Sequence, residues 1–265
     1  MKLKHIANTV KPAGFVNLHQ LTALLALATG LFATGCSTTH HAHHAHHAHH
    51  AHHAHHAPPP TAKAQQQAIT PAQALAQLEA GNARFAVGQS LHHNWPQQVA
   101  ATAGGQYPVA IVLSCVDSRA SSEIVFDQGL GDIFNARIAG NIVNDDIIGS
   151  MEFACKVAGA KLIAVVGHTH CGAIKGACSG VQLGHLTGLL GKIQPSVAEA
   201  KAKLPGVAVT DSKLIEEAAE LNVHHVVQQI REQSPVLREL IDAGKVGIVG
   251  GIYDLDSGKV RFFHN

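Results

Sequence analysis

The sequence predicts an α/β fold in which a parallel sheet carries helices on both faces. Two short apolar runs rich in β-branched residues, 109–113 and 162–166, have the composition of strands buried inside a parallel sheet. Segments with helical spacing of apolar residues lie before, between and after these runs. Because strands that alternate with helices need crossover connections, we expect the helices to cover the sheet.

The first helix is predicted over residues 71–87, where apolar residues recur at helical spacing. Thr70 precedes Pro71, which is the arrangement of a cap followed by proline in the first turn. A loop rich in His, Gly and Gln is expected to lead from this helix to the strand at 109–113.

A second strand is predicted over 133–138, followed by a turn at 139–141. Asn144 or Asp145 can cap a helix that continues to Val157, and Gly159 can end it. The strand at 162–166 follows this helix.

Three helical segments and a hairpin complete the predicted fold. Pro195 is expected to kink or split the first segment, and Asp211 and Ser234 are expected to cap the others. The helical segments are 184–202, 211 to about 232, and 235 to about 244, and the hairpin pairs 246–253 with 260–263.

Residues 1–35 have the features of an export signal. Lysines begin the segment, and its apolar stretch, 21–33, is too short to span a bilayer. Small residues precede Cys36, and this pattern resembles a bacterial lipoprotein cleavage site. It implies lipidation of Cys36 and an exported protein in the periplasm or cell envelope, anchored to a membrane. The alternative is an ordinary secretory signal with an incidental cysteine.

Residues 36–69 are expected to form a flexible tether, and residues 70–265 the folded domain. Twelve histidines lie between His40 and His56 in repeats of Ala-His-His, a composition that buries too little apolar surface to fold. The repeats could serve as a metal reservoir, a proton buffer or a simple spacer. The formal net charge is +1, and the absence of a basic stripe from the folded part argues against nucleic-acid binding.

Two clusters of reactive residues follow the two central strands. Cys115, Asp117 and Arg119 come just after the first strand, and His168 and Cys171 come just after the other. Ligands bind beyond the carboxyl ends of strands in open α/β sheets, so both clusters should meet at one crevice. Two thiolates and an imidazole suit zinc and leave a fourth tetrahedral position for water. The remaining cysteines of the folded part, Cys155 and Cys178, could pair or remain as buried thiols.

The pattern Cys-x-Asp-Ser-Arg, then Arg-Ile-Ala-Gly-Asn at 137–141, then Gly-His-x-x-Cys resembles the β-class carbonic anhydrases over roughly residues 70–265. The resemblance implies zinc-dependent hydration of carbon dioxide to bicarbonate. It also implies four parallel strands with an antiparallel edge strand, and homodimers or dimers of dimers. Two alternatives stay open: a carbonyl sulfide or carbon disulfide hydrolase on the same scaffold, and a zinc-binding lipoprotein dominated by its histidines.

The resemblance also implies roles for single residues. Asp117 either occupies the fourth metal position or turns away to pair with Arg119. Gln106 holds an oxygen of the substrate with its amide, Phe134 walls the substrate pocket, and both lie across or near a subunit boundary. Gly140 is expected to bring backbone close to the metal crevice, with tight-turn geometry as the alternative.

A further match concerns a regulatory pocket. Arg137 matches the arginine of a noncatalytic bicarbonate pocket that one subgroup of the family contains, whereas Val112 replaces the tryptophan of that pocket. We therefore expect this chain to resemble the subgroup that lacks the pocket.

Overall fold

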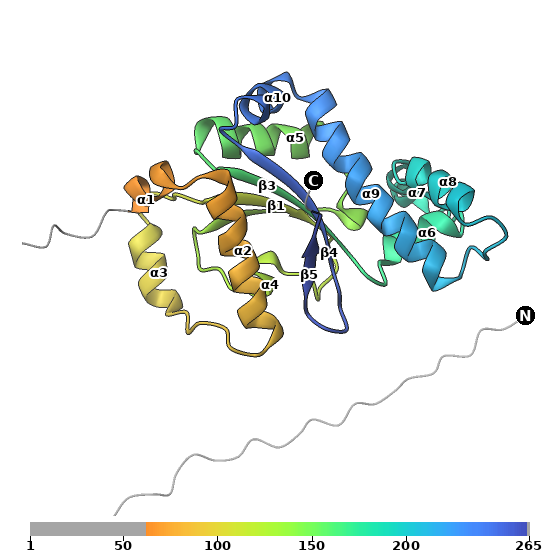
Figure 1. Cartoon of the computed structure of the whole chain (residues 1–265), viewed down its shortest axis with the longest axis horizontal. Helices are drawn as coiled ribbons and strands as arrows, with labels where there is room; N and C mark the ends of the chain where they lie inside the picture. Colours follow the sequence, from red (N-terminus) through yellow and green to blue (C-terminus); the bar gives the residue numbers. More distant parts are fainter. Residues whose placement is uncertain (1–61, 264–265) are drawn as a thin grey trace, which may run out of the picture. The chain divides into compact units, whose positions relative to one another are not determined.

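A computed structural model describes residues 62–263, which contain a five-stranded sheet with the strand order β2-β1-β3-β4-β5 (Figure 1). Strands β1 to β4 are parallel, and β5 is antiparallel to β4, which confirms the predicted sheet. The strands are β1 (Ala110–Ser114), β2 (Ile133–Arg137), β3 (Leu162–His168), β4 (Gly247–Tyr253) and β5 (Val260–Phe262).

Helices cover the sheet on both faces, as expected, and a short 3-10 turn, η1, and a π-helical turn, η2, complete the elements. They are α1 (Ala62–Ala68), α2 (Pro71–Ala86), α3 (Trp95–Thr102), α4 (Ser122–Val125), η1 (Ala139–Asn141), α5 (Asp145–Glu152), η2 (Phe153–Val157), α6 (Gly172–Cys178), α7 (Gly184–Gly191), α8 (Gln194–Lys203), α9 (Ser212–Gln233) and α10 (Pro235–Asp242).

The two central strands are buried along their whole length because their alternate side chains enter two different cores. Ile111 and Ile163 pack in a core with residues of α5, α9 and α10. Val112 and Ala164 pack in another with residues of α2 and α4. This two-sided burial explains why both strands consist almost entirely of apolar residues.

The predicted helix caps are present. The side-chain oxygen of Thr70 accepts a hydrogen bond from the backbone of Gln73 and completes a capping box. Asn144, Asp211 and Ser234 also accept hydrogen bonds from the first turns of α5, α9 and α10. Pro195 lies in the first turn of α8, and the predicted segment is split there into α7 and α8.

The last residues of the predicted tether form helix α1 instead. Gln66 is buried in it, and its Nε2 donates hydrogen bonds to the carbonyls of Pro108 and Ala158, both at 2.8 Å. This amide anchors α1 to the segments that precede β1 and β3, a long-range contact that the polar sequence of the helix does not signal. Residues 1–61, with the proposed signal, Cys36 and the histidine repeats, lie outside the described residues.

Three further helices, α3, α4 and α6, were not predicted. Helix α3 occupies part of the segment expected to be a loop, and Asn94 caps it. None of the residues of α3 is buried, so this helix adds nothing to the apolar core. Helix α6 follows the second reactive cluster directly. Within residues 62–263, no helix is long and apolar enough to cross a membrane.

Candidate zinc centre

The three predicted metal ligands meet at the carboxyl ends of β1 and β3. Cys115 directly follows β1, His168 is the last residue of β3, and Cys171 is the N-cap of α6. Because β1 and β3 are adjacent and parallel, their ends lie at the same edge of the sheet. The ligand atoms lie within 4.8 Å of one another, and the two sulfurs are 4.0 Å apart.

The hydrogen bonds of His168 leave one ring nitrogen for a metal. Its Nδ1 lies 2.8 Å from the carbonyl of Thr169, which can only accept, so Nδ1 carries the proton. Its Nε2 is buried and has no hydrogen-bond partner among the described residues. Nε2 and the two sulfurs together form a donor set that zinc prefers. The three residues therefore fit a zinc ion.

The sulfurs differ in their tendency to ionise. The pKa of Cys115 is lowered to about 4, chiefly by a hydrogen bond from Cys171. Burial acts in the opposite direction, whereas His168 and the backbone of Gly140 lower this pKa further. The same contact with Cys115, together with burial, raises the pKa of Cys171. One thiolate therefore forms readily, and the positive charge of a bound cation would ionise the second thiol.

Asp117 is paired with Arg119 beside the three ligands. The Nε and Nη2 of Arg119 donate to the two carboxylate oxygens at 2.9 and 2.8 Å, and its backbone amide adds a bond of 3.0 Å. These contacts hold the pKa of Asp117 well below its usual range, despite the opposing effect of partial burial. Its Oδ2 lies 4.0 Å from Nε2 of His168. Of the two positions expected for Asp117, the structure has the one paired with Arg119.

Backbone close to the ligands comes from the turn η1. The amide of Gly140 donates to the sulfur of Cys115 at 3.4 Å. Gly140 has a φ of +69°, and a β-carbon there would lie 2.7 Å from a methyl group of Ile193. Both expectations for Gly140, the close backbone and the tight turn, therefore hold at once.

Two side chains hold this arrangement from outside. Arg137 donates to the carbonyls of Cys115 and Asp117, so it braces the loop that carries both residues. Asn222 of α9 donates to the carbonyl of Gly140 at 2.8 Å. Asn222 was not predicted as a site residue, although a lone amide on the apolar face of a helix is a signal that the sequence contains.

Gln106 and Phe134 are not beside the zinc ligands of their own chain. Gln106 is exposed and precedes β1, whereas Cys115 follows it, so the whole five-residue strand, about 17 Å long, lies between them. Phe134 lies in β2 at the edge of the sheet, where its ring packs against Phe153 with centroids 6.0 Å apart.

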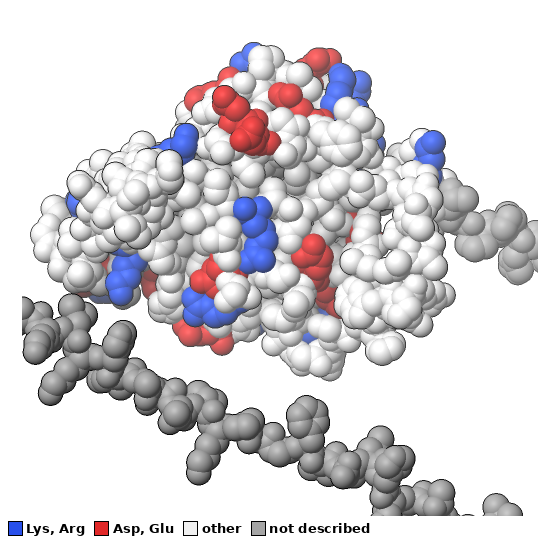
Figure 2. All heavy atoms as spheres, turned by 180° about the vertical axis from the view of Figure 1, so that it is seen from behind, with Lys and Arg blue, Asp and Glu red and all other residues white. Residues whose placement is uncertain are grey.

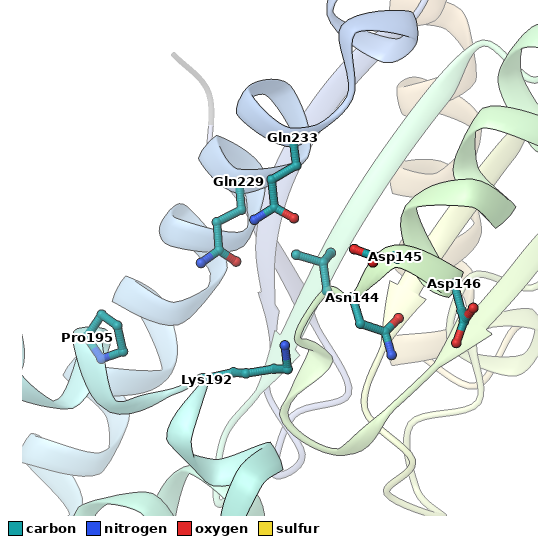
Figure 3. Close-up of a pocket in the computed structure, with 8 residues that line it drawn as sticks. Asn144, Asp145, Asp146, Lys192, Pro195, Gln229 and Gln233 are labelled. Carbon is teal, nitrogen blue, oxygen red and sulfur yellow. The ribbon is translucent and has the colours of Figure 1, made fainter.

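A separate polar cavity of about 450 Å³ lies between α9, the start of α5 and the turn before α8 (Figure 3). It contains none of the three metal ligands. On the face of the molecule that Figure 2 shows, basic and acidic side chains lie in small, intermixed groups. The polar residues that line the cavity are Asn144, Asp145, Asp146, Lys192, Gln229 and Gln233.

A zinc site of two cysteines and one histidine at the carboxyl edge of a mainly parallel sheet defines a class of single-metal α/β enzymes. Residues 110–260 match the family model described as "Carbonic anhydrase". Carbonic anhydrase 2 of Mycobacterium tuberculosis is 36% identical over 190 residues, which cover 69% of this chain and 87% of that protein. The carbonic anhydrase of Mycolicibacterium smegmatis is also 36% identical, with coverage of 69% and 89%.

Solved structures agree with this assignment. A β-carbonic anhydrase of Aspergillus fumigatus has a TM-score of 0.59 and 26% identity, covering 72% of this chain and 89% of that chain. A tetrameric β-carbonic anhydrase of Sordaria macrospora has a TM-score of 0.58 and 25% identity, with coverage of 72% and 95%. The chain belongs to the carbonic anhydrase family, in its β class.

Proposed function

We propose that this protein catalyses the reversible hydration of carbon dioxide to bicarbonate and a proton, with zinc held by Cys115, His168 and Cys171. The observation that carries the proposal is the convergence of these three buried donors beside the Asp117–Arg119 pair. When bound, zinc supplies a positive charge that makes water acidic near neutral pH and stabilises the anionic product.

The protein's own residues orient the reacting water. Arg119 keeps Asp117 ionised and holds both of its carboxylate oxygens, so Asp117 can accept a hydrogen bond from the attacking oxygen nucleophile. That bond directs a lone pair of the nucleophile toward the carbon of carbon dioxide. A new C–O bond then forms, one C=O bond loses its π electrons to oxygen, and a proton passes to buffer.

A stopped-flow assay of carbon dioxide hydration, with zinc quantified in the same samples, tests this function. We expect wild-type protein to contain one zinc per chain and the Cys115→Ser/His168→Ala double variant to lose both zinc and activity. Full activity in the zinc-free double variant would reject the proposal. Carbonyl sulfide and carbon disulfide are assayed alongside, because a preference for either one would identify the alternative hydrolase.

We also propose that a second copy of the chain completes each active site, in a homodimer or a dimer of dimers. Strand β2 ends the sheet, and the neighbouring Phe153 and Val157 are 50% and 73% exposed. Helix α3 buries none of its residues and exposes Trp95 and Val99. Gln106 cannot contact the zinc ligands of its own chain. Association of two copies across this edge would place Gln106 of each copy beside the zinc ligands of the other.

Complementation between subunits tests the shared site. Gln106→Ala leaves the zinc ligands of its own chain intact, whereas Cys115→Ser leaves Gln106 intact for the partner. A 1:1 mixture of these two inactive variants should recover about a quarter of wild-type activity, because about half of the dimers are then heterodimers and one of the two sites in each heterodimer is complete. If Gln106 served its own subunit, mixing would restore nothing.

We propose further that the protein is exported and anchored to a bacterial membrane through lipid on Cys36. Support comes from the basic start, the apolar stretch 21–33 and the small residues before Cys36. In cells fed radiolabelled palmitate, the wild-type protein should be labelled and found with membranes. The Cys36→Ala variant should be unlabelled; equal labelling of both proteins would refute the anchor.

A further inference from the structure

Asn222 is a buried amide on the apolar face of α9. It is 1% exposed, and helical spacing aligns it with the buried residues Ala218, Val226 and Ile230. A buried amide is costly unless it is hydrogen bonded. Its Nδ2 donates to the carbonyl of Gly140 at 2.8 Å, which connects α9 to the turn beside the zinc ligands.

The turn that Asn222 contacts has an unfavourable backbone conformation. Gly140 and Asn141 are consecutive residues with φ of +69° and +42°, in the left-handed region. Asparagine enters this region more readily than most residues with a side chain but less readily than glycine, so contacts around the turn help to hold it in place. Within the turn, the Asn141 amide donates a hydrogen bond to the carbonyl of Ile138. The bond from Asn222 is therefore well placed to stabilise this turn.

This turn also presents a backbone amide to a zinc ligand. The N–H of Gly140 points at the sulfur of Cys115 from 3.4 Å. Such a bond fixes the position of the sulfur and draws electron density from it. Because two thiolates offset the charge of a zinc ion, this withdrawal leaves the ion more positive and the site better ordered.

We propose that Asn222 is a positioning residue of the zinc centre: it clamps the Gly140–Asn141 turn so that the Gly140 amide holds the sulfur of Cys115. The inference rests on the zinc site of the proposed function. Asn222 contacts neither the metal ligands nor the substrate, and it acts through Gly140.

Zinc release separates this role from a merely structural one. The variants Asn222→Leu, which keeps the branched shape without the polar atoms, and Asn222→Asp, which removes the donor, should transfer zinc to an excess of chelator about tenfold faster than wild type. The matched control is Asn82→Leu. Asn82 is also buried, and it donates to the carbonyls of Val125 and Gly258, away from the zinc ligands. We expect Asn82→Leu to lose stability but to release zinc at the wild-type rate.

A spectroscopic measurement on the wild-type protein keeps the inference testable if the Asn222 variants do not fold. With cadmium substituted for zinc, the amide proton of Gly140 should show NMR coupling to the metal through the sulfur. Absence of this coupling would overturn the inference. So would zinc release from folded Asn222 variants within twofold of both wild type and the control. Failure of the wild-type protein to bind zinc would instead reject the proposed function.

Discussion

Arg137 at the end of β2 donates from Nε to the carbonyl of Cys115 at 3.0 Å, across the carboxyl edge of the sheet. Its Nη2 donates to the carbonyl of Asp117. One planar guanidinium therefore ties together the residue that supplies a sulfur and the residue that orients the nucleophile. In one subgroup of the family, the matching arginine belongs to a noncatalytic bicarbonate pocket. In this chain, Arg137 instead holds the loop that carries Cys115 and Asp117.

Replacing Arg137 with lysine should loosen this loop. A lysine ammonium group is compact and cannot reproduce the two-pronged contact, so we expect kcat/KM to fall about tenfold while the zinc content stays at the wild-type level. Stopped-flow kinetics with metal analysis would measure both. Arg231→Lys, at an exposed pair with Asp242 on α9 and α10, is the control and should leave kcat/KM unchanged. Equal kinetics for the two variants would show that Arg137 does not position the loop.

Loss of a single zinc ligand should remove the metal. Cys115→Ser and His168→Ala each leave two protein donors in place of three, so zinc content should fall to a small fraction of one per chain. The matched control is Cys155→Ala. Cys155 is buried in η2, and its pKa is raised to about 12 by burial. It should keep full zinc content, as measured by metal analysis after dialysis; loss of zinc from this variant would point to unfolding rather than ligand loss.

Asp117→Asn should retain zinc but lose most activity. The amide keeps the shape of the side chain, yet Arg119 would face a neutral partner and the attacking oxygen would lose a charged acceptor. We expect kcat to fall about a hundredfold, the lower end of the range for acid–base groups. Because Arg119 holds the pKa of Asp117 far below neutral, the carboxylate stays ionised at pH 6 and pH 9. The loss should therefore be similar at both values, and recovery at either one would contradict this role.

Asp127 should govern stability in acid. Its side chain is 1% exposed, and it bonds to Arg84, to the backbone of Leu91 and to His93. Burial raises its pKa, but these three partners outweigh burial and leave the pKa lowered overall. A lowered pKa means that the stabilisation is fully present above the unfolded value of about 3.9 and is lost as pH falls through the folded value.

Asp127→Asn tests this interpretation, since asparagine tolerates the positive φ of 48° at this position. We expect the free energy of unfolding at pH 7 to fall by about 3 kcal/mol, the lower end for a broken buried pair, because Arg84 is one-third exposed. Urea unfolding at pH 7 and pH 3 would measure it. The difference between variant and wild type should shrink at pH 3; an equal difference at both would exclude the carboxylate charge as its source.

Local sequence patterns were sufficient for most of the fold. Strands β1 and β3 are apolar along their length because both faces are covered, and a run such as 162–166 shows this directly. The caps at Thr70, Asn144, Asp211 and Ser234 depend on bonds within one helical turn, so they too could be predicted. Helices α1 and α3 could not, because the first depends on the long-range bonds of Gln66 and the second has no buried face.

The sequence by itself determined which atoms can bind the metal: the spacing of Cys115, His168 and Cys171 after two buried strands was sufficient to predict the zinc centre. Only the tertiary structure decided what holds those atoms in place. The contact of Asn222 with Gly140 spans 82 residues of chain, and that of Arg137 with Cys115 spans 22. Hydrogen bonds of this kind depend on how helices and strands pack, and no periodicity along the chain encodes them.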